Sequence, residues 1–275
     1  GGDEAKKTPW EHCPRCQTRM QEHGLDDVHE LQSWFIKRIQ KFVNSRGRRI
    51  IGWDEILEGG LASGAAVMSW RGFAGGLEAA RAGHDVVMTP SQFVYLNRVQ
   101  GDPQFEPYGS RPALDVKTVY SFEPVPAELS GDASEHILGG HGCLWTEHIP
   151  DTARLEYMLF PRFLALSEAL WTQPDRKSYD DFYPRMARRL LVLSGQGVNF
   201  RRPVPAGIPE RVLFETDTSV TLVNPLKRRG AQVHYTLDGE TPDADSPVYS
   251  EPLRITGSAV LKARLRFPDG SFSNT

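Results

Sequence analysis

The sequence predicts an α/β domain followed by a small all-β domain. Short apolar segments alternate with amphipathic helical segments over residues 1–202, which is the pattern of an α/β fold. The apolar segments are continuous, and this favours parallel strands covered by helices. Beyond the proline-rich segment 203–209 the pattern changes to short alternating stretches separated by turns. We therefore expect a first domain at 1–202, a linker at 203–209 and an all-β domain at 210–275.

The first clear element is a helix over residues 26–46. Its apolar residues recur at intervals of three and four positions: Val28, Leu31, Phe35, Ile39 and Phe42. Asp26 or Asp27 can cap the start of this helix, and Gly47 can end it.

Strands and helices then follow in alternation. The expected strands of the first domain are 48–53, 65–70, 85–90 and 136–145. The expected helices are 75–83, 152–171 and 179–195. The last domain has alternating stretches at 219–223, 232–239, 253–257 and 259–267, which predict the strands of a sandwich-like module.

Composition excludes some classes of protein. The 275 residues carry a formal net charge of −3, so no basic excess is present to neutralise the phosphates of a nucleic acid. No apolar run approaches the roughly 20 residues of a membrane span. Cys13 and Cys16 form a CxxC pair, but no second pair follows, so a loop pair, a local disulfide and half of a metal site all stay open. We expect no cofactor.

An aromatic residue ends or follows each strand of the first domain: Trp53, Trp70, Tyr95 and Trp145. The carboxyl ends of parallel strands lie on one side of a sheet, and in a (β/α)8 barrel this side carries the active site. Aromatic rings with carboxylates among them suit a sugar, because pyranose faces stack on rings and carboxylates accept from hydroxyls. The pattern indicates a carbohydrate site.

Five motifs then occur in order: GGDE, GWDEI, SWRG, YLN and LWTE. Together they closely resemble the family 20 glycoside hydrolases, the β-N-acetylhexosaminidases. The resemblance implies that residues 1–202 are the C-terminal half of a (β/α)8 TIM barrel, and that 210–275 are the small β domain that follows it. The chain would begin within the catalytic motif. The missing N-terminal half of the barrel would then be a required partner, and the chain alone is expected to be inactive.

The resemblance also implies catalytic roles. Glu4 would be the general acid and base, and Asp3 would accept from the acetamido N–H of the sugar. Tyr95 would donate its hydroxyl to the acetamido carbonyl. The substrate would be a β-N-acetylhexosaminide oligosaccharide or glycoconjugate, cleaved with help from its own acetamido group.

Other residues would bind the sugar. By the same resemblance these are Trp53, Trp70, Trp145, Glu147 and Asn97. Family members commonly have Asp where this chain has Asn97, so the preference between N-acetylglucosamine and N-acetylgalactosamine is open. In bacteria the family is typically periplasmic or secreted.

Two rival interpretations remain. One is a non-catalytic carbohydrate-binding protein, against which the presence of Glu4 argues. The other is a redox or zinc module built on Cys13 and Cys16. Asp54 and Glu55 are interpreted as polar anchors of a loop beside the pocket. His84, His136, His141 and His148 have no metal-ligand spacing and are interpreted as loop or core residues.

Overall fold

The computed structural model describes residues 4–104, 106–209, 211–227 and 230–274. The chain divides into two compact units. The first comprises Gly1–Tyr95, Ser121–Cys143 and Ala169–Trp171, and it contains a parallel sheet. The second comprises Leu96–Tyr120, Leu144–Glu168 and Thr172–Thr275, and it contains small antiparallel sheets.

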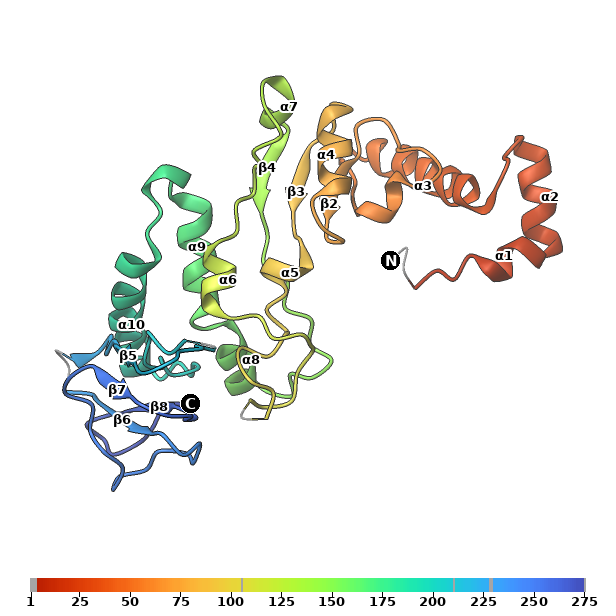
Figure 1. Ribbon diagram of the computed structural model, residues 1–275. Coiled ribbons are helices and arrows are strands. Elements are labelled where there is room, and N and C mark those ends of the chain that lie inside the picture. The colour runs from red at the N-terminus through yellow and green to blue at the C-terminus, as the bar shows by residue number, and fades with distance from the viewer. Residues whose placement is uncertain (1–3, 105, 210, 228–229, 275) are drawn as a thin grey trace. The chain divides into compact units, whose positions relative to one another are not determined.

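Four parallel strands in chain order form the sheet of the first unit (Figure 1). They are β1 (Ile51–Trp53), β2 (Ala66–Ser69), β3 (Val86–Met88) and β4 (Ile137–Gly140). Val67 and Val86 are fully buried, as expected for strands covered on both faces. The parallel arrangement predicted from the continuous apolar runs is confirmed. Because the strands run the same way, their carboxyl ends share one side of the sheet.

The helices of the first unit lie before and between these strands in the chain. They are α1 (Thr8–His12), α2 (Pro14–His23), α3 (Val28–Asn44), α4 (Ala74–Arg81), α5 (Ser91–Val94) and α7 (Asp132–Glu135). The predicted helix 26–46 is confirmed as α3, and its cap is Asp27, whose side chain accepts from the backbone N–H groups of His29 and Glu30 at 2.8 Å. Gly76 lets α4 approach β3, because a Cβ at this position would lie 2.5 Å from the Met88 side chain.

Two predicted boundaries are wrong. The strand expected over 136–145 is only β4, so Trp145 lies beyond the strand and does not end it. Gly139, with a φ of 133°, has a backbone conformation that other residues rarely adopt, and the ladder stops after the next residue. The helix expected over 152–171 is two helices, α8 (Thr152–Leu159) and α9 (Arg162–Trp171). Pro161 separates them because proline lacks the N–H that would continue the ladder.

The second unit contains the predicted β module. Its strands are β5 (Thr218–Val220), β6 (Gln232–Thr236), β7 (Leu253–Ile255) and β8 (Lys262–Arg266), paired antiparallel as β5 with β7 and β6 with β8. The other elements of this unit are α6 (Val116–Tyr120), α8, most of α9, the 3₁₀ turn η2 (Pro174–Arg176) and α10 (Tyr179–Gly195). Ala187 of α10 belongs to the same buried cluster as Val233 and Leu265, so this helix packs directly on the β module.

The segment predicted as a linker is hydrogen-bonded along its length. The Tyr183 hydroxyl donates to the Val204 carbonyl at 2.9 Å, and Ala206 exchanges two backbone hydrogen bonds with Val223. The domain boundaries themselves stay a prediction.

Within the described ranges, no helix combines the length and the apolar character needed to cross a bilayer.

Arg162 is the largest fully buried side chain of the second unit, and it binds backbone carbonyls. Its guanidinium donates to the carbonyls of Leu96 (2.6 Å), Arg98 (2.8 Å), Leu114 (3.1 Å) and Met158 (2.6 Å). Burial lowers the pKa of Arg162 to about 9, so it remains charged at neutral pH. One side chain therefore holds both ends of the loop 96–114 against the end of α8.

Arg162→Met should destabilise the protein severely. The variant keeps most of the apolar stem but leaves four carbonyls without their donor, which we expect to lower the free energy of unfolding by about 3 kcal/mol or more. Urea denaturation measures this. Arg189→Met, at an exposed position of α10, is the matched control and should change stability by no more than about 0.5 kcal/mol. Equal stabilities for the two variants would contradict the role assigned to Arg162.

Candidate active site

Two adjacent carboxylates are buried where β1 ends. Trp53 is the last residue of the strand, and the chain passes directly into the 3₁₀ turn η1 (Asp54–Leu57). Asp54 is 2% exposed and Glu55 is 4% exposed. A buried carboxylate is costly unless donors satisfy it, so the partners of these two groups determine the local structure.

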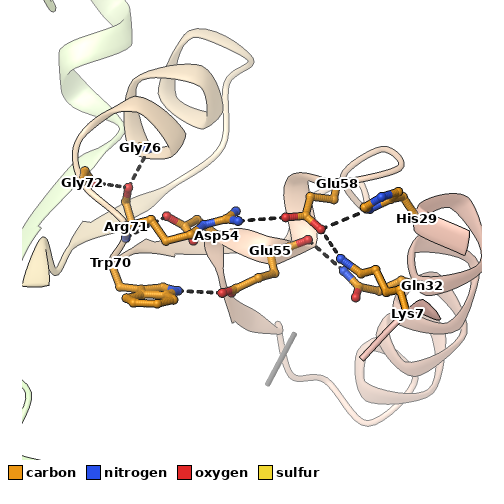
Figure 2. Close-up of polar contacts among 11 residues, drawn as sticks. Lys7, His29, Gln32, Asp54, Glu55, Glu58, Trp70, Arg71, Gly72 and Gly76 are labelled. Atoms are coloured by element: carbon orange, nitrogen blue, oxygen red, sulfur yellow. Dashed lines mark hydrogen bonds and ion pairs between the residues drawn. The ribbon is translucent and has the colours of Figure 1, made fainter. Parts of the chain in front are cut away.

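Asp54 holds the loop that follows β2. Its Oδ1 accepts from Nε of Arg71 at 2.8 Å, and its Oδ2 accepts from the backbone N–H of Arg71 at 3.2 Å. Arg71 reaches on to Glu58, where its Nη1 donates to Oε1 at 2.8 Å (Figure 2). The loop after one strand is thus anchored by the turn after its neighbour.

Glu55 holds the next residue of the same loop. Its Oε1 accepts from the indole Nε1–H of Trp70 at 2.8 Å (Figure 2). The Trp70 ring stacks on Tyr95, with ring centroids 6.1 Å apart and planes 18° apart. Tyr95 pairs with Cys143 in an isolated parallel bridge beyond β3. Two residues predicted from separate motifs therefore lie together at the carboxyl end of the sheet.

The SWRG loop has internal anchors as well. The hydroxyl of Ser69 donates to the Gly72 carbonyl at 2.7 Å and accepts from the Gly76 N–H at 2.9 Å. Both glycines lie on the far side of Trp70 and Arg71 in the chain, so this hydroxyl closes the loop. The position of the Trp70 ring is therefore determined by the loop backbone and by Glu55 together.

Glu58 connects η1 to the N-terminal segment. Its Oε2 accepts from Lys7 and lies 3.2 Å from Nδ1 of His29. Burial alone would raise the pKa of Glu58, but the hydrogen bonds and charges of Lys7 and Arg71 outweigh it and lower the pKa to about 2. The ion pair therefore ties the chain just after Glu4 to the turn that holds the SWRG loop.

The remaining predicted residues of the first unit are Asp3, Glu4 and Trp53. Asp3 lies outside the described residues, and Glu4 is exposed in a turn where its carbonyl accepts from the Lys6 N–H at 3.0 Å. Trp53 lines a cavity of about 650 Å³ together with Ala5, Glu55 and side chains of α2 and α3. The indole at the end of β1 thus borders an open space near the start of the chain.

Three predicted residues belong to the second unit. Asn97 donates from Nδ2 to the Ser110 hydroxyl at 3.1 Å. Trp145 is 40% exposed, and Glu147 is exposed in the stretch after Cys143. The structure brings Trp70 and Tyr95 together within the first unit. That these two converge on one pocket with Asp3, Glu4, Trp53, Trp145 and Glu147 stays a prediction.

The part of the chain that the structure describes contains no group of His, Cys, Asp and Glu side chains suited to a metal ion. Cys13, Cys16 and Cys143 are free thiols. His84 contacts the Ala65 carbonyl at 2.9 Å and His136 lies 3.4 Å from Asp85, which agrees with their interpretation as loop and core residues.

Sequence reasoning anticipated the anchoring role of Asp54 and Glu55 but not their partners. Arg71, Gln32 and Ser69 are the residues it missed. Arg71 directly follows Trp70, and its charge is opposite to that of the carboxylates in the preceding motif, GWDEI, so the SWRG motif contained a usable signal. Nothing in the sequence indicated the role of Gln32, because an amide on a helix face is ordinarily solvated.

Comparison with known proteins shows two family matches. Residues 1–174 match the model described as glycosyl hydrolase family 20, catalytic domain. Residues 211–275 match the chitobiase/beta-hexosaminidase C-terminal domain. Together they confirm the predicted fold class: part of a TIM barrel followed by a small β domain.

Individual relatives and a solved structure support the same family assignment. A beta-hexosaminidase of Porphyromonas gingivalis is 40% identical over 99% of this chain and 35% of its own length. The human beta-hexosaminidase subunit beta is 28% identical over 75% of this chain and 36% of its own length. A crystal structure of a GH20 exo beta-N-acetylglucosaminidase from Vibrio harveyi with N-acetylglucosamine superposes with a TM-score of 0.68 at 34% identity, covering 74% of this chain and 32% of that one. The chain thus spans about a third of the length of these relatives.

Glu58→Gln should destabilise the protein in a pH-dependent way. The folded-state pKa of about 2 lies below the ordinary value of 4.5, so the carboxylate contributes stability that is complete above 4.5 and is lost as the pH falls toward 2. Urea denaturation should therefore show the variant less stable than wild type at neutral pH, with the difference shrinking at about pH 3. Glu22→Gln, at an exposed residue of α2, is the control. A difference that stays constant with pH would contradict the ion pair.

Proposed function

The chain belongs to glycosyl hydrolase family 20, and from this premise we propose that it supplies catalytic residues of a β-N-acetylhexosaminidase. The proposed substrates carry terminal, non-reducing β-linked N-acetylglucosamine or N-acetylgalactosamine. The observation that carries the proposal is the stacked pair of Trp70 and Tyr95 at the carboxyl ends of adjacent strands. The Vibrio harveyi enzyme, whose structure contains N-acetylglucosamine, supports this choice of sugar.

The proposed reaction is substrate-assisted. The acetamido oxygen of the sugar attacks C1 while Glu4 protonates the departing glycosidic oxygen, which gives an oxazolinium ion and the free aglycone. Glu4, now a carboxylate, removes a proton from water as the water attacks C1 and the acetamido oxygen leaves. One water is consumed, Glu4 regains its proton, and the configuration at C1 is retained.

The acetamido group must be oriented for this attack. Asp3 would accept from its N–H and offset the positive charge of the oxazolinium ion. The Tyr95 hydroxyl would donate to its oxygen. The Trp70 indole, stacked on Tyr95, would form an apolar wall for the acetamido methyl group.

We propose four further residues as contacts of the rest of the sugar. Trp53 and Trp145 would pack against the pyranose ring, and Glu147 and Asn97 would hydrogen-bond its hydroxyls.

The compartment is a separate proposal. Bacterial members of the family are typically periplasmic or secreted, so we propose the same location for this protein. Cell fractionation tests this proposal.

Glu4→Gln in the full-length protein should reduce turnover of β-N-acetylglucosaminides with poor leaving groups by roughly 10²–10⁴-fold, since it removes the proton donor and keeps the shape. Substrates with very good leaving groups should be less affected, because their departing oxygen needs little protonation. Steady-state kinetics over a series of aryl glycosides measures both effects.

Glu11→Gln, at an exposed residue of α1, is the matched control for this experiment and should keep wild-type rates. If Glu4→Gln also keeps near wild-type rates on poor leaving groups, Glu4 is not the acid. If the wild-type protein binds N-acetylglucosamine but hydrolyses none of the series, the chain belongs to a carbohydrate-binding protein.

Asn97→Asp should tighten sugar binding. The change restores the residue common in the family and exchanges a neutral hydrogen bond for a charge-assisted one, which lowers KM by about 10-fold where a sugar hydroxyl is its partner. Comparing KM for the glucosaminide and galactosaminide also shows which C4 configuration the residue reads. An unchanged KM for both would exclude contact between Asn97 and the sugar.

A further inference from the structure

Glu55 is placed to orient another side chain, since its own carboxylate is closed off. It is 4% exposed, and its Oε1 accepts from the Trp70 indole. Its Oε2 is buried and has no hydrogen-bond partner among the described residues. A buried carboxylate that accepts from an indole N–H is suited to orienting that ring.

Glu55 is fixed independently of the loop that carries Trp70. The Gln32 side chain, 7% exposed on α3, donates to the Glu55 backbone carbonyl at 2.9 Å (Figure 2). The residue also belongs to η1, which continues directly from β1. The backbone of Glu55 is thus held by β1 and by α3, so its side chain starts from a fixed point beside the neighbouring loop.

The Trp70 ring needs two constraints for a single orientation. Stacking on Tyr95 sets the plane of the ring but permits it to slide and rotate within that plane. The indole has one hydrogen-bond donor, Nε1–H, and anchoring that atom to Glu55 fixes the in-plane orientation. Stack and hydrogen bond together specify where the edge of the indole lies.

We propose that Glu55 is a positioning residue that fixes the Trp70 indole against Tyr95 and thereby sets the size of the acetamido pocket. This inference rests on the proposed function, in which Trp70 and Tyr95 contact the acetamido group. A carboxylate suits the task because it only accepts hydrogen bonds, and the charge of Arg71 interacts with it. The buried, unpartnered Oε2 is a cost that an ordinary loop anchor would not need to retain.

The first test examines the bond itself and needs no activity. In the ¹⁵N-labelled chain, Trp70→Phe identifies the indole N–H signal of Trp70. Glu55→Leu should accelerate exchange of this proton with solvent at least about 10-fold, because its acceptor is gone. Glu55→Gln should keep it protected, since the amide oxygen can accept in place of Oε1. Equal exchange in wild type and Glu55→Leu would overturn the proposal.

The second test is the choice of acyl group in the full-length protein. Wild type should prefer a 2-acetamido substrate over its 2-propanamido analogue, and Glu55→Leu should reduce that ratio of kcat/KM by about 10-fold because the indole can move aside. Glu55→Gln should restore the ratio, and Trp70→Phe should lower it. The effects of Glu55→Leu and Trp70→Phe should not add in the double variant, because both remove one hydrogen bond. Glu11→Leu is the control.

The outcomes separate this inference from the proposed function. A wild-type protein without hydrolytic activity refutes the function, whereas the exchange experiment still decides whether Glu55 holds Trp70. An active enzyme whose acyl preference is unchanged by Glu55→Leu refutes the positioning role. If Glu55→Gln folds but loses turnover of poor leaving groups selectively, Glu55 acts as an acid and the proposal is wrong. Should Glu55→Leu fail to fold, the wild-type chain still decides: slow exchange of the Trp70 indole proton supports the bond to Glu55, and exchange as fast as that of an exposed indole overturns it.

Discussion

The need to satisfy two buried carboxylates at the end of β1 determines much of the first unit. Asp54 and Glu55 are adjacent, and neither can be left without donors in an apolar setting. Their donors, Arg71 and Trp70, are also adjacent and belong to the loop after the next strand. Parallel register makes this possible, because the carboxyl ends of β1 and β2 lie side by side. Because the buried Glu55 carboxylate needs a donor, it binds the Trp70 indole and so fixes the position of that ring.

In the second unit the buried charge is a cation, which needs hydrogen-bond acceptors where the carboxylates need donors. Arg162 lacks a carboxylate within hydrogen-bonding distance among the described residues, and four backbone carbonyls surround it instead. A planar guanidinium with five donors can bind several chain segments at once, which a lysine ammonium cannot do with the same geometry. In both units, buried charged groups hold a loop that regular secondary structure does not: the SWRG loop in the first unit and the loop 96–114 in the second.

The sequence predicted the elements better than their ends and their contacts. Continuous apolar runs such as 65–70 predict buried parallel strands, because burial on both faces removes the alternation of apolar and polar residues. The extent of β4 was predicted wrongly because the small residues after Gly140 look apolar whether or not they pair. The predicted helix 152–171 ran through Pro161, where the structure has two helices. The roles of Gln32 and Arg162 were not predictable, since an isolated amide or guanidinium on a helix has the same local pattern when buried as when solvated. The motifs located Trp70 and Tyr95, but only the structure shows that they stack.

A glycosidase that uses the acetamido group of its substrate as nucleophile depends on orientation more than on a strong protein nucleophile. Its protein must hold the group close to C1, and a displacement of about 1 Å can cost 100-fold in rate. Aromatic walls supply favourable contact area, but an apolar contact is non-directional and leaves the ring free to shift. A hydrogen bond to the one polar atom of the indole supplies the missing direction. In the reaction proposed above, the polar residues around Trp70 would determine the position of a pocket wall without touching the sugar.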